Sequence, residues 1–236
     1  MVELTLPIVI IAALLDSINP CVFGVLIFLI AFMTKVFKSA HRMLVGGLIY
    51  TLVVYITYLL LGIGFLKFTS SLGLSIIIYW IAALIAIIAG LLEIKDYFAY
   101  GKGFSLQIIP GAAKRIKFIT TKMAKVDKKH PYLTYLMAVG LGIFVVFVEL
   151  PCTGAPYLAI LALLGQGSIT EALLLLFLYN FIFILPLFVI IGIAYFGTSS
   201  KVLEKWRQKH KGLMRLVVGL FLVALGLYMI YSIYSV

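Results

Sequence analysis

Long apolar stretches constrain this sequence more than any other feature. The hydrocarbon core of a bilayer, about 30 Å thick, is crossed by about 20 apolar residues in a helix. Six stretches of the sequence reach that length, and they cover residues 6–33, 43–66, 72–94, 132–164, 171–196 and 213–235. A helix satisfies its own backbone hydrogen bonds inside lipid. The sequence therefore predicts an all-α integral membrane protein with six transmembrane helices.

The composition agrees with this class. Apolar residues make up 64% of the chain and charged residues 11%, whereas soluble domains are about half apolar and about a quarter charged. The alternating pattern of barrel strands is absent from the sequence. The start of the chain, Met1-Val2-Glu3, lacks the basic residues of a signal peptide, and the apolar run resumes after Asp16. We therefore expect residues 6–33 to be a retained span.

Basic residues are distributed unevenly among the connections. Those after the first, third and fifth stretches hold 3, 9 and 6 lysines and arginines, and the one after the second holds 1. Basic loops of membrane proteins face the cytoplasm. This 18-to-1 distribution predicts a multi-pass protein of the cell membrane with both termini outside. We expect the net charge of +11 to meet anionic headgroups of the lipid bilayer, not nucleic acid.

The chain divides into two similar halves. Residues 1–95 and 132–236 each hold three of the apolar stretches, and residues 96–131 form a basic cytoplasmic linker between them. Because three is an odd number, the second half must cross the membrane in the opposite direction. The pattern predicts two inverted three-helix repeats. Such repeats place working sites at their interface near the bilayer midplane, commonly on broken helices.

Prolines predict a break in the first and the fourth span. A proline lacks the N–H that bonds to the carbonyl four residues earlier, and its ring clashes with that carbonyl. Pro20 and Pro151 occupy corresponding positions, 131 residues apart, and Pro156 would free the carbonyl of Cys152. Freed backbone groups are tolerated in a membrane only where protein or a wet cavity satisfies them. Two matched breaks therefore indicate a site.

The two cysteines of the chain, Cys21 and Cys152, directly follow Pro20 and Pro151. Each would begin a half-helix, where free N–H groups and the positive end of the helix dipole stabilise a thiolate, the species that attacks a disulfide. Gly24 and Gly154 add little bulk, so another backbone could approach. A lone cysteine is more often a small buried apolar residue, but the matched Pro-Cys pair favours a redox-active disulfide.

Two acidic residues lie inside the same two spans, Asp16 in the first and Glu149 in the fourth. Ionisable groups in membrane helices are commonly functional, and thiol–disulfide exchange moves protons with electrons, so one interpretation is proton handling. The alternative is that they cap the broken backbone or lie near the membrane interface. The histidines fall in cytoplasmic connections without ligand spacing, so we expect no metal site.

The segments that carry the cysteines, Asn19-Pro20-Cys21 and Glu149-Leu150-Pro151-Cys152-Thr153-Gly154-Ala155-Pro156, resemble the two cysteine motifs of the CcdA family. That family is similar to the membrane domain of the DsbD thiol-disulfide interchange proteins, and the resemblance covers nearly the whole chain. It implies a thiol-disulfide oxidoreductase that passes electrons from cytoplasmic thioredoxin to extracytoplasmic thioredoxin-like proteins, in support of cytochrome c biogenesis. We expect a monomer whose redox-active cysteine pair needs no further cofactor.

Two other classes of function stay open. Paired thiolates are good ligands for Cu(I), so a membrane transporter of a small solute or a soft metal is the main alternative. Against it, the chain has only 7 methionines and none adjoins a cysteine. A structural membrane subunit is the third possibility, but it leaves the matched Pro-Cys pair without an explanation.

The predicted topology can be tested with reporter fusions. A reporter fused at residue 110 and one fused at the C-terminus should report opposite sides of the membrane, because the basic linker faces the cytoplasm. Reporters that both report the same side would contradict the inverted arrangement of the two halves.

Overall fold

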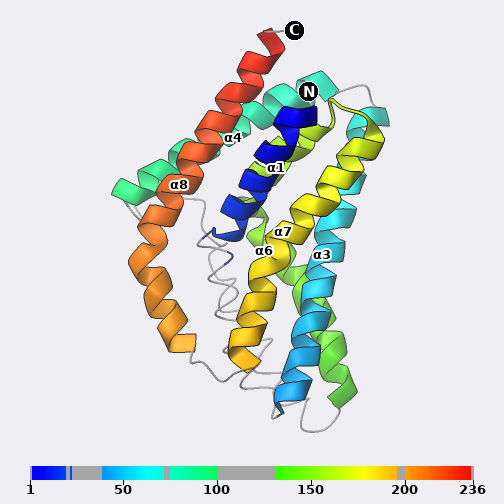
Figure 1. Ribbon diagram of the computed structural model, residues 1–236, viewed down its shortest axis with the longest axis vertical. Helices are drawn as coiled ribbons and strands as arrows, with labels where there is room; N and C mark the ends of the chain where they lie inside the picture. Colours follow the sequence, from blue (N-terminus) through cyan, green and yellow to red (C-terminus); the bar gives the residue numbers. More distant parts are fainter. Residues whose placement is uncertain are drawn as a thin grey trace.

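The computed structural model describes residues 2–19, 22, 39–71, 75–99, 131–195 and 200–234. All regular structure in this part of the chain is α-helical (Figure 1), which confirms the predicted all-α class. The helices are α1 (Val2–Ser17), α3 (Ala40–Ser71), α4 (Ser75–Phe98), α6 (Pro131–Leu164), α7 (Ile169–Tyr195) and α8 (Ser200–Tyr234).

Four of these helices, α3, α4, α7 and α8, are long and apolar enough to cross a membrane, and α6 is a fifth if its two bent parts form one span. Large apolar side chains cover their outward surfaces. Leu60 of α3 is 64% exposed, Ile76 of α4 63% and Leu174 of α7 67%. A helix that is apolar on every side is stable where acyl chains surround it. The chain is therefore a multi-pass membrane protein.

The helix bounds differ from the apolar stretches mainly in α8. This helix begins at Ser200, well before residue 213. The added residues include lysine, arginine, glutamate and glutamine, which favour helix, so the helix continues beyond its apolar part. α1 covers the beginning of the predicted span 6–33 and ends at Ser17. Residues 20, 21 and 23–33 of that span, and residues 100–130 of the predicted linker, lie outside the described part.

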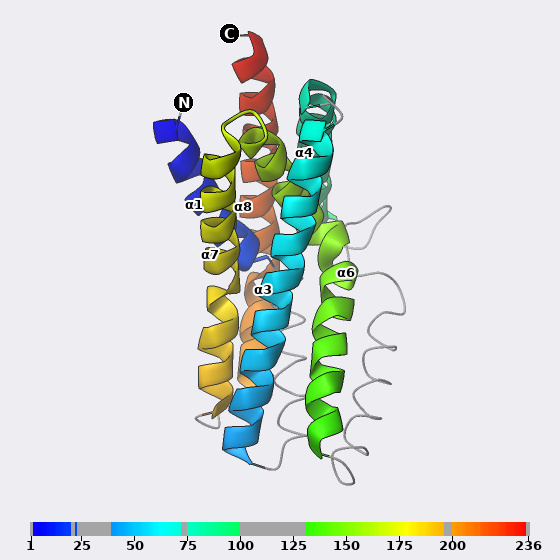
Figure 2. The ribbon, with the colours of Figure 1, turned by 90° about the vertical axis from the view of Figure 1, so that its right-hand side faces the viewer.

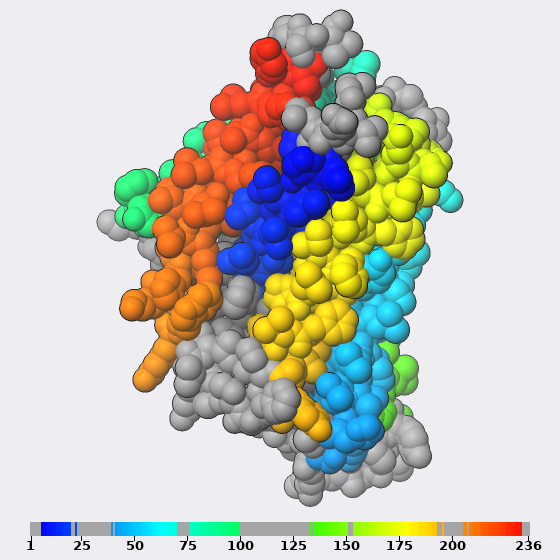
Figure 3. Space-filling model, in the orientation of Figure 1, coloured from blue at the N-terminus to red at the C-terminus, as the bar shows by residue number. Residues whose placement is uncertain are grey.

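The helices pack as a bundle and a crossed pair. α3, α6, α7 and α1 form the bundle, and α4 packs mainly against α8, with further contacts to α6 (Figure 2). Figure 3 shows α1, in blue, lying between α7, in yellow, and α8, in orange and red. The beginning of α1 and the end of α8 lie at the same end of the molecule in both ribbon views, and α3 begins at the opposite end.

α4 and α8 approach so closely that their backbones touch. A Cβ atom added at Gly90 would lie 2.6 Å from the carbonyl oxygen of Gly219, and one added at Gly219 would lie 2.8 Å from that of Gly90. Small residues are typical of membrane helix contacts, because lipid tails are as apolar as the helices and close packing must supply the attraction. The hydroxyls of Tyr79 and Ser232 add a hydrogen bond of 2.8 Å between the two helices.

The same helix pair is joined by a buried ion cluster. Arg215 of α8 donates from Nη1 to Oδ2 of Asp96 at 2.5 Å, and Nη1 lies 3.7 Å from Oε2 of Glu93. Nζ of Lys95 lies 2.9 Å from Oδ1 of Asp96. Two acids and two bases therefore balance one another. Charged groups within membrane helices are stable when they are paired in this way, so the cluster fixes the register of α4 against α8.

Leucine in place of Gly90 or Gly219 should force α4 and α8 apart. Overpacking of this kind lowers the free energy of unfolding by about 1–3 kcal/mol. Unfolding of the purified protein, followed by helix signal in detergent, measures the change. Gly64→Leu is the matched control, because a side chain at Gly64 meets no described atom within 4 Å. If Gly90→Leu were as stable as Gly64→Leu, the close contact would be wrong.

Candidate functional site

α6 bends sharply at the predicted fourth-span break. Its two parts, Tyr135–Leu150 and Thr153–Leu164, are inclined at 83°, and the residues between them are Pro151 and Cys152. The missing N–H of Pro151 and the clash of its ring with the carbonyl of Phe147 account for a bend at this point. The side chains of Pro151 and Cys152 lie outside what the structure describes.

Pro156 and Gly154 lie just beyond the bend, and both are buried. Pro156 is in the first turn of the second part of α6, where a missing N–H costs little. A Cβ atom at Gly154 would meet, among the described atoms, only Cδ2 of Leu150, at 3.9 Å. A small side chain at residue 154 would therefore have room among the described atoms.

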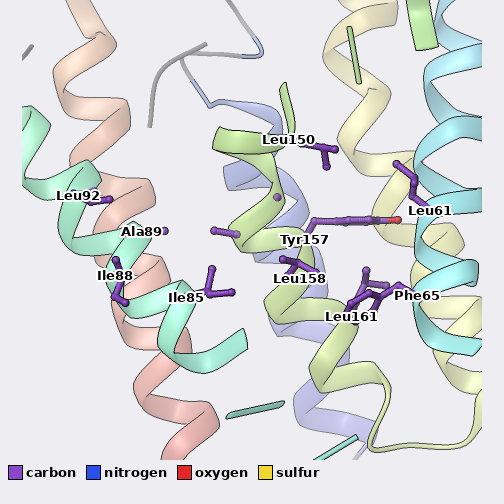
Figure 4. Close-up of a pocket in the computed structure, with 12 residues that line it drawn as sticks. Leu61, Phe65, Ile85, Ile88, Ala89, Leu92, Leu150, Tyr157, Leu158 and Leu161 are labelled. Carbon is purple, nitrogen blue, oxygen red and sulfur yellow. The ribbon is translucent and has the colours of Figure 1, made fainter. Parts of the chain in front are cut away.

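An apolar cavity of about 530 Å³ lies beside the bend, between α3, α4 and α6. Leu150 and Gly154 line it on the two sides of the break, Ile88 lines it from α4 and Phe65 from α3. Figure 4 shows the hydroxyl of Tyr157 directed away from α4 and toward α3. Tyr157 is the one polar side chain among the described residues that line this cavity, and its hydroxyl is turned toward α3.

Helix α1 ends a few residues before Cys21, the first of the two predicted redox cysteines. α1 ends at Ser17, and the amide of Asn19 bonds to the carbonyl of Asp16 at 3.1 Å in a closing turn. A helix that stops here agrees with the restriction that a following proline imposes on the residue before it. Pro20, Cys21 and Gly24, three of the predicted site residues, lie outside the described residues.

Asp16 is buried, with 2% of its surface exposed, and it points toward α7. The hydroxyl of Tyr179 donates to its Oδ2 at 3.0 Å, and the buried side chain of Asn19 lies next to the same carboxyl group. Asp16 therefore lies at a contact between α1 and α7.

Glu149 is also buried, with 4% exposed, in the last turn before the bend of α6. It interacts electrostatically with Tyr50 of α3, which is 2% exposed. Asp16 therefore accepts a hydrogen bond from a buried tyrosine on α7, and Glu149 lies near a buried tyrosine on α3.

Hydrogen bonds between α3, α6 and α7 connect the region between these acids. The hydroxyls of Tyr58 and Thr153 lie 2.9 Å apart, and the hydroxyl of Tyr157 donates to the backbone carbonyl of Tyr58 at 2.6 Å. Asn180 of α7 donates to the hydroxyl of Tyr157 at 3.4 Å and to the carbonyl of Leu176 at 2.9 Å. The result is a polar network in the centre of an otherwise apolar bundle.

The sequence analysis missed the partners in this network. Nothing in the sequence distinguishes Tyr50, Tyr58, Tyr157 and Tyr179 from packing residues, since tyrosine is common in membrane helices and at their interfaces. Thr153 gave a weak signal through its place directly after Cys152. Buried polar groups in lipid mark functional positions, and here they surround the bend. They can orient the break and can hold or pass protons near it.

No family model, no curated protein and no solved structure matches this chain.

Proposed function

We propose that this protein is a thiol-disulfide oxidoreductase of the cell membrane. It passes electrons from cytoplasmic thioredoxin to extracytoplasmic thioredoxin-like proteins through Cys21 and Cys152, in support of cytochrome c maturation. The observation that carries the proposal is the 83° bend of α6 at Pro151 and Cys152. A bend of this size inside a membrane helix leaves N–H groups at the start of the second part, where they favour a thiolate.

The packing supports two inverted three-helix repeats, and the distribution of basic residues favours six spans with both termini outside. Corresponding spans would be α1 and α6, α3 and α7, and α4 and α8, and each of these pairs is in contact. Four of the remaining contacts form two corresponding pairs: α1 packs on α7 as α6 packs on α3, and α1 packs on α8 as α6 packs on α4. A two-fold relation between the halves produces such a pattern and places the breaks of α1 and α6 at its centre.

Electron transfer proceeds by two thiol–disulfide exchanges with thioredoxin, followed by two with the external partner. A thiolate of reduced thioredoxin attacks one sulfur of the Cys21–Cys152 disulfide, forms a mixed disulfide and releases the other cysteine as a thiolate. The second thiolate of thioredoxin then attacks the mixed disulfide, and thioredoxin leaves oxidised. The resulting dithiol reduces a disulfide of the external partner by the same two steps. Each cycle moves two electrons, and one monomer without a bound cofactor suffices.

Protons must accompany these electrons, because thiols form from thiolates. Asp16 is five residues before Cys21 and Glu149 is three residues before Cys152. The burial of both residues, and the hydrogen bond from Tyr179 to Asp16, support proton handling by these carboxyl groups. A carboxyl group that is held by a neighbouring hydroxyl can accept or return a proton without contact with bulk water.

Transport of a polar solute or of Cu(I) fits the region less well. The cavity beside the bend is lined by apolar side chains, apart from Tyr157, whose hydroxyl donates to the carbonyl of Tyr58. A polar solute needs hydrogen-bonding groups along its path, and Cu(I) needs further soft ligands. Thiol exchange with soluble partners needs neither.

Serine at either cysteine should abolish electron transfer. Cys21→Ser and Cys152→Ser each leave a single thiol, which can form a mixed disulfide but cannot resolve it. The measurement is reduction of an external thioredoxin-like domain by proteoliposomes that contain thioredoxin, its reductase and NADPH. Ala159→Ser, on the same helix as Cys152, is the matched control and should transfer electrons normally. Wild-type transfer by either cysteine variant would refute the dithiol mechanism.

Replacement of Asp16 by asparagine and of Glu149 by glutamine distinguishes proton handling from a structural role. Asparagine keeps an oxygen that can accept the hydrogen bond from Tyr179, so Asp16→Asn preserves a structural role but removes the exchangeable proton. If the carboxyl groups handle protons, Asp16→Asn and Glu149→Gln should each slow transfer by about a hundredfold. The exposed Glu171 supplies the control, Glu171→Gln, which should have no effect. Unchanged rates in the first two variants would assign the acids a structural role.

A further inference from the structure

Tyr58 of α3 holds α6 at two points next to the bend. Its hydroxyl lies 2.9 Å from Oγ1 of Thr153, and its backbone carbonyl accepts a hydrogen bond of 2.6 Å from the hydroxyl of Tyr157. Thr153 and Tyr157 are four residues apart and therefore lie on one face of the second part of α6. Tyr58, Thr153 and Tyr157 are called the Tyr58 clamp below.

The donors and acceptors of the clamp can be assigned. The hydroxyl of Thr153 donates to the backbone carbonyl of Glu149 at 3.1 Å. Because a threonine hydroxyl has one proton, its oxygen must accept the hydrogen bond that it shares with Tyr58. Glu149 belongs to the part of α6 before the bend and Thr153 to the part after it. The bonds from Tyr58 through Thr153 to Glu149 therefore cross the break.

The clamp is closed off from solvent. Tyr58, Thr153 and Tyr157 are 2%, 0% and 4% exposed. The ring of Tyr58 is fixed by edge-to-face contacts with Tyr157, at 5.6 Å between ring centres, and with Phe183, at 5.1 Å. A buried hydroxyl that loses its partner has no water to replace it. Any rearrangement of the bend must therefore break the clamp and provide new partners.

We propose that the Tyr58 clamp is a positioning element for Cys152, which holds the bend of α6 in one of two working orientations. The inference rests on the proposed function, which requires Cys152 to become reachable from each side of the membrane in turn. Thr153 directly follows Cys152, so the backbone of Cys152 cannot turn toward the other side while Thr153 stays bonded to Tyr58. The clamp thereby sets the fraction of molecules that present Cys152 to each side.

The expected effect is a redistribution, not unfolding. One hydrogen bond between membrane helices shifts a two-state equilibrium by about threefold on average and by about twentyfold at most. The many other contacts of α3 with α6 are unaffected by loss of one hydroxyl. Tyr58→Phe and Thr153→Val keep the shape of the side chain. The first removes the hydrogen bond between Tyr58 and Thr153, and the second removes that bond and the one from Thr153 to the carbonyl of Glu149.

The test measures how fast Cys152 is labelled from each side of a sealed vesicle. Full-length protein with Cys21→Ser carries Cys152 as its sole thiol, and a membrane-impermeant maleimide is applied to one side and then to the other. Tyr58→Phe and Thr153→Val should change the ratio of the two rates by about threefold or more. Thr153→Ser retains the hydroxyl and should retain the original ratio.

Two variants control for the loss of similar bonds elsewhere. Tyr79→Phe removes the tyrosine–hydroxyl bond to Ser232, between α4 and α8. Thr51→Val removes the bond of a buried threonine to the carbonyl four residues earlier, Gly47, at 3.0 Å. Both should leave the ratio unchanged. Unshifted ratios in Tyr58→Phe and Thr153→Val, or an equal shift in Tyr79→Phe, would overturn the clamp.

Hydrogen exchange of the amides at residues 149–157 gives a second measurement that needs no reactive thiol. Exchange should rise by about threefold or more in both clamp variants, and unchanged exchange would overturn the proposal. Neither measurement involves thioredoxin. If the ratio shifts in the Cys21→Ser background but the protein with both cysteines transfers no electrons, the clamp stands and the proposed function is refuted. If the protein with both cysteines transfers electrons normally and the ratio is unshifted, the clamp alone is refuted.

Discussion

Backbone groups that are freed inside a membrane helix must find partners within the protein, because lipid offers none. At the bend of α6, Pro151 removes a donor and the 83° turn separates the two parts of the helix. The surrounding helices are arranged to meet this need. The hydroxyl of Thr153 donates a hydrogen bond to the carbonyl of Glu149, and α3 supplies Tyr58, whose hydroxyl bonds to that of Thr153. The carboxyl groups of Glu149 and Asp16 also need partners inside the protein, and each is buried near a tyrosine.

The two groups of helices differ in what joins them. α4 and α8 are held by touching backbones at Gly90 and Gly219 and by the ion cluster around Arg215, so sliding of one against the other would separate charges in lipid. The contacts of α6 with α3 and α7 depend instead on single hydrogen bonds, such as that between Asn180 and Tyr157. Single bonds can be exchanged at modest cost, and this contrast supports movement near the bend within a stationary frame.

Length and proline made most of the fold predictable. Apolar stretches of the right length become helices in lipid whatever their detailed order, and Pro151 predicts the bend because its chemistry forbids an ordinary helix. The polar partners were not predictable. Tyr58 and Tyr179 are indistinguishable from other membrane tyrosines until helices distant in sequence are placed side by side. The early start of α8 was missed because apolarity, and not helix preference, was used to set its limits. Asp16 and Glu149 were chosen from the sequence as candidate site residues because a carboxyl group in lipid is rare.

The ion cluster between α4 and α8 has a consequence for biosynthesis. α4 leaves the ribosome long before α8, so Glu93 and Asp96 enter the membrane while Arg215 has not yet been made. Until then Lys95 is the one base beside two acids, and α4 holds an uncompensated charge and an open glycine face. A chain that is cut short before α8 would keep both defects permanently. Insertion of α8 supplies both the missing base, Arg215, and the facing glycine, Gly219, so α4 becomes compatible with lipid only after α8 has been made.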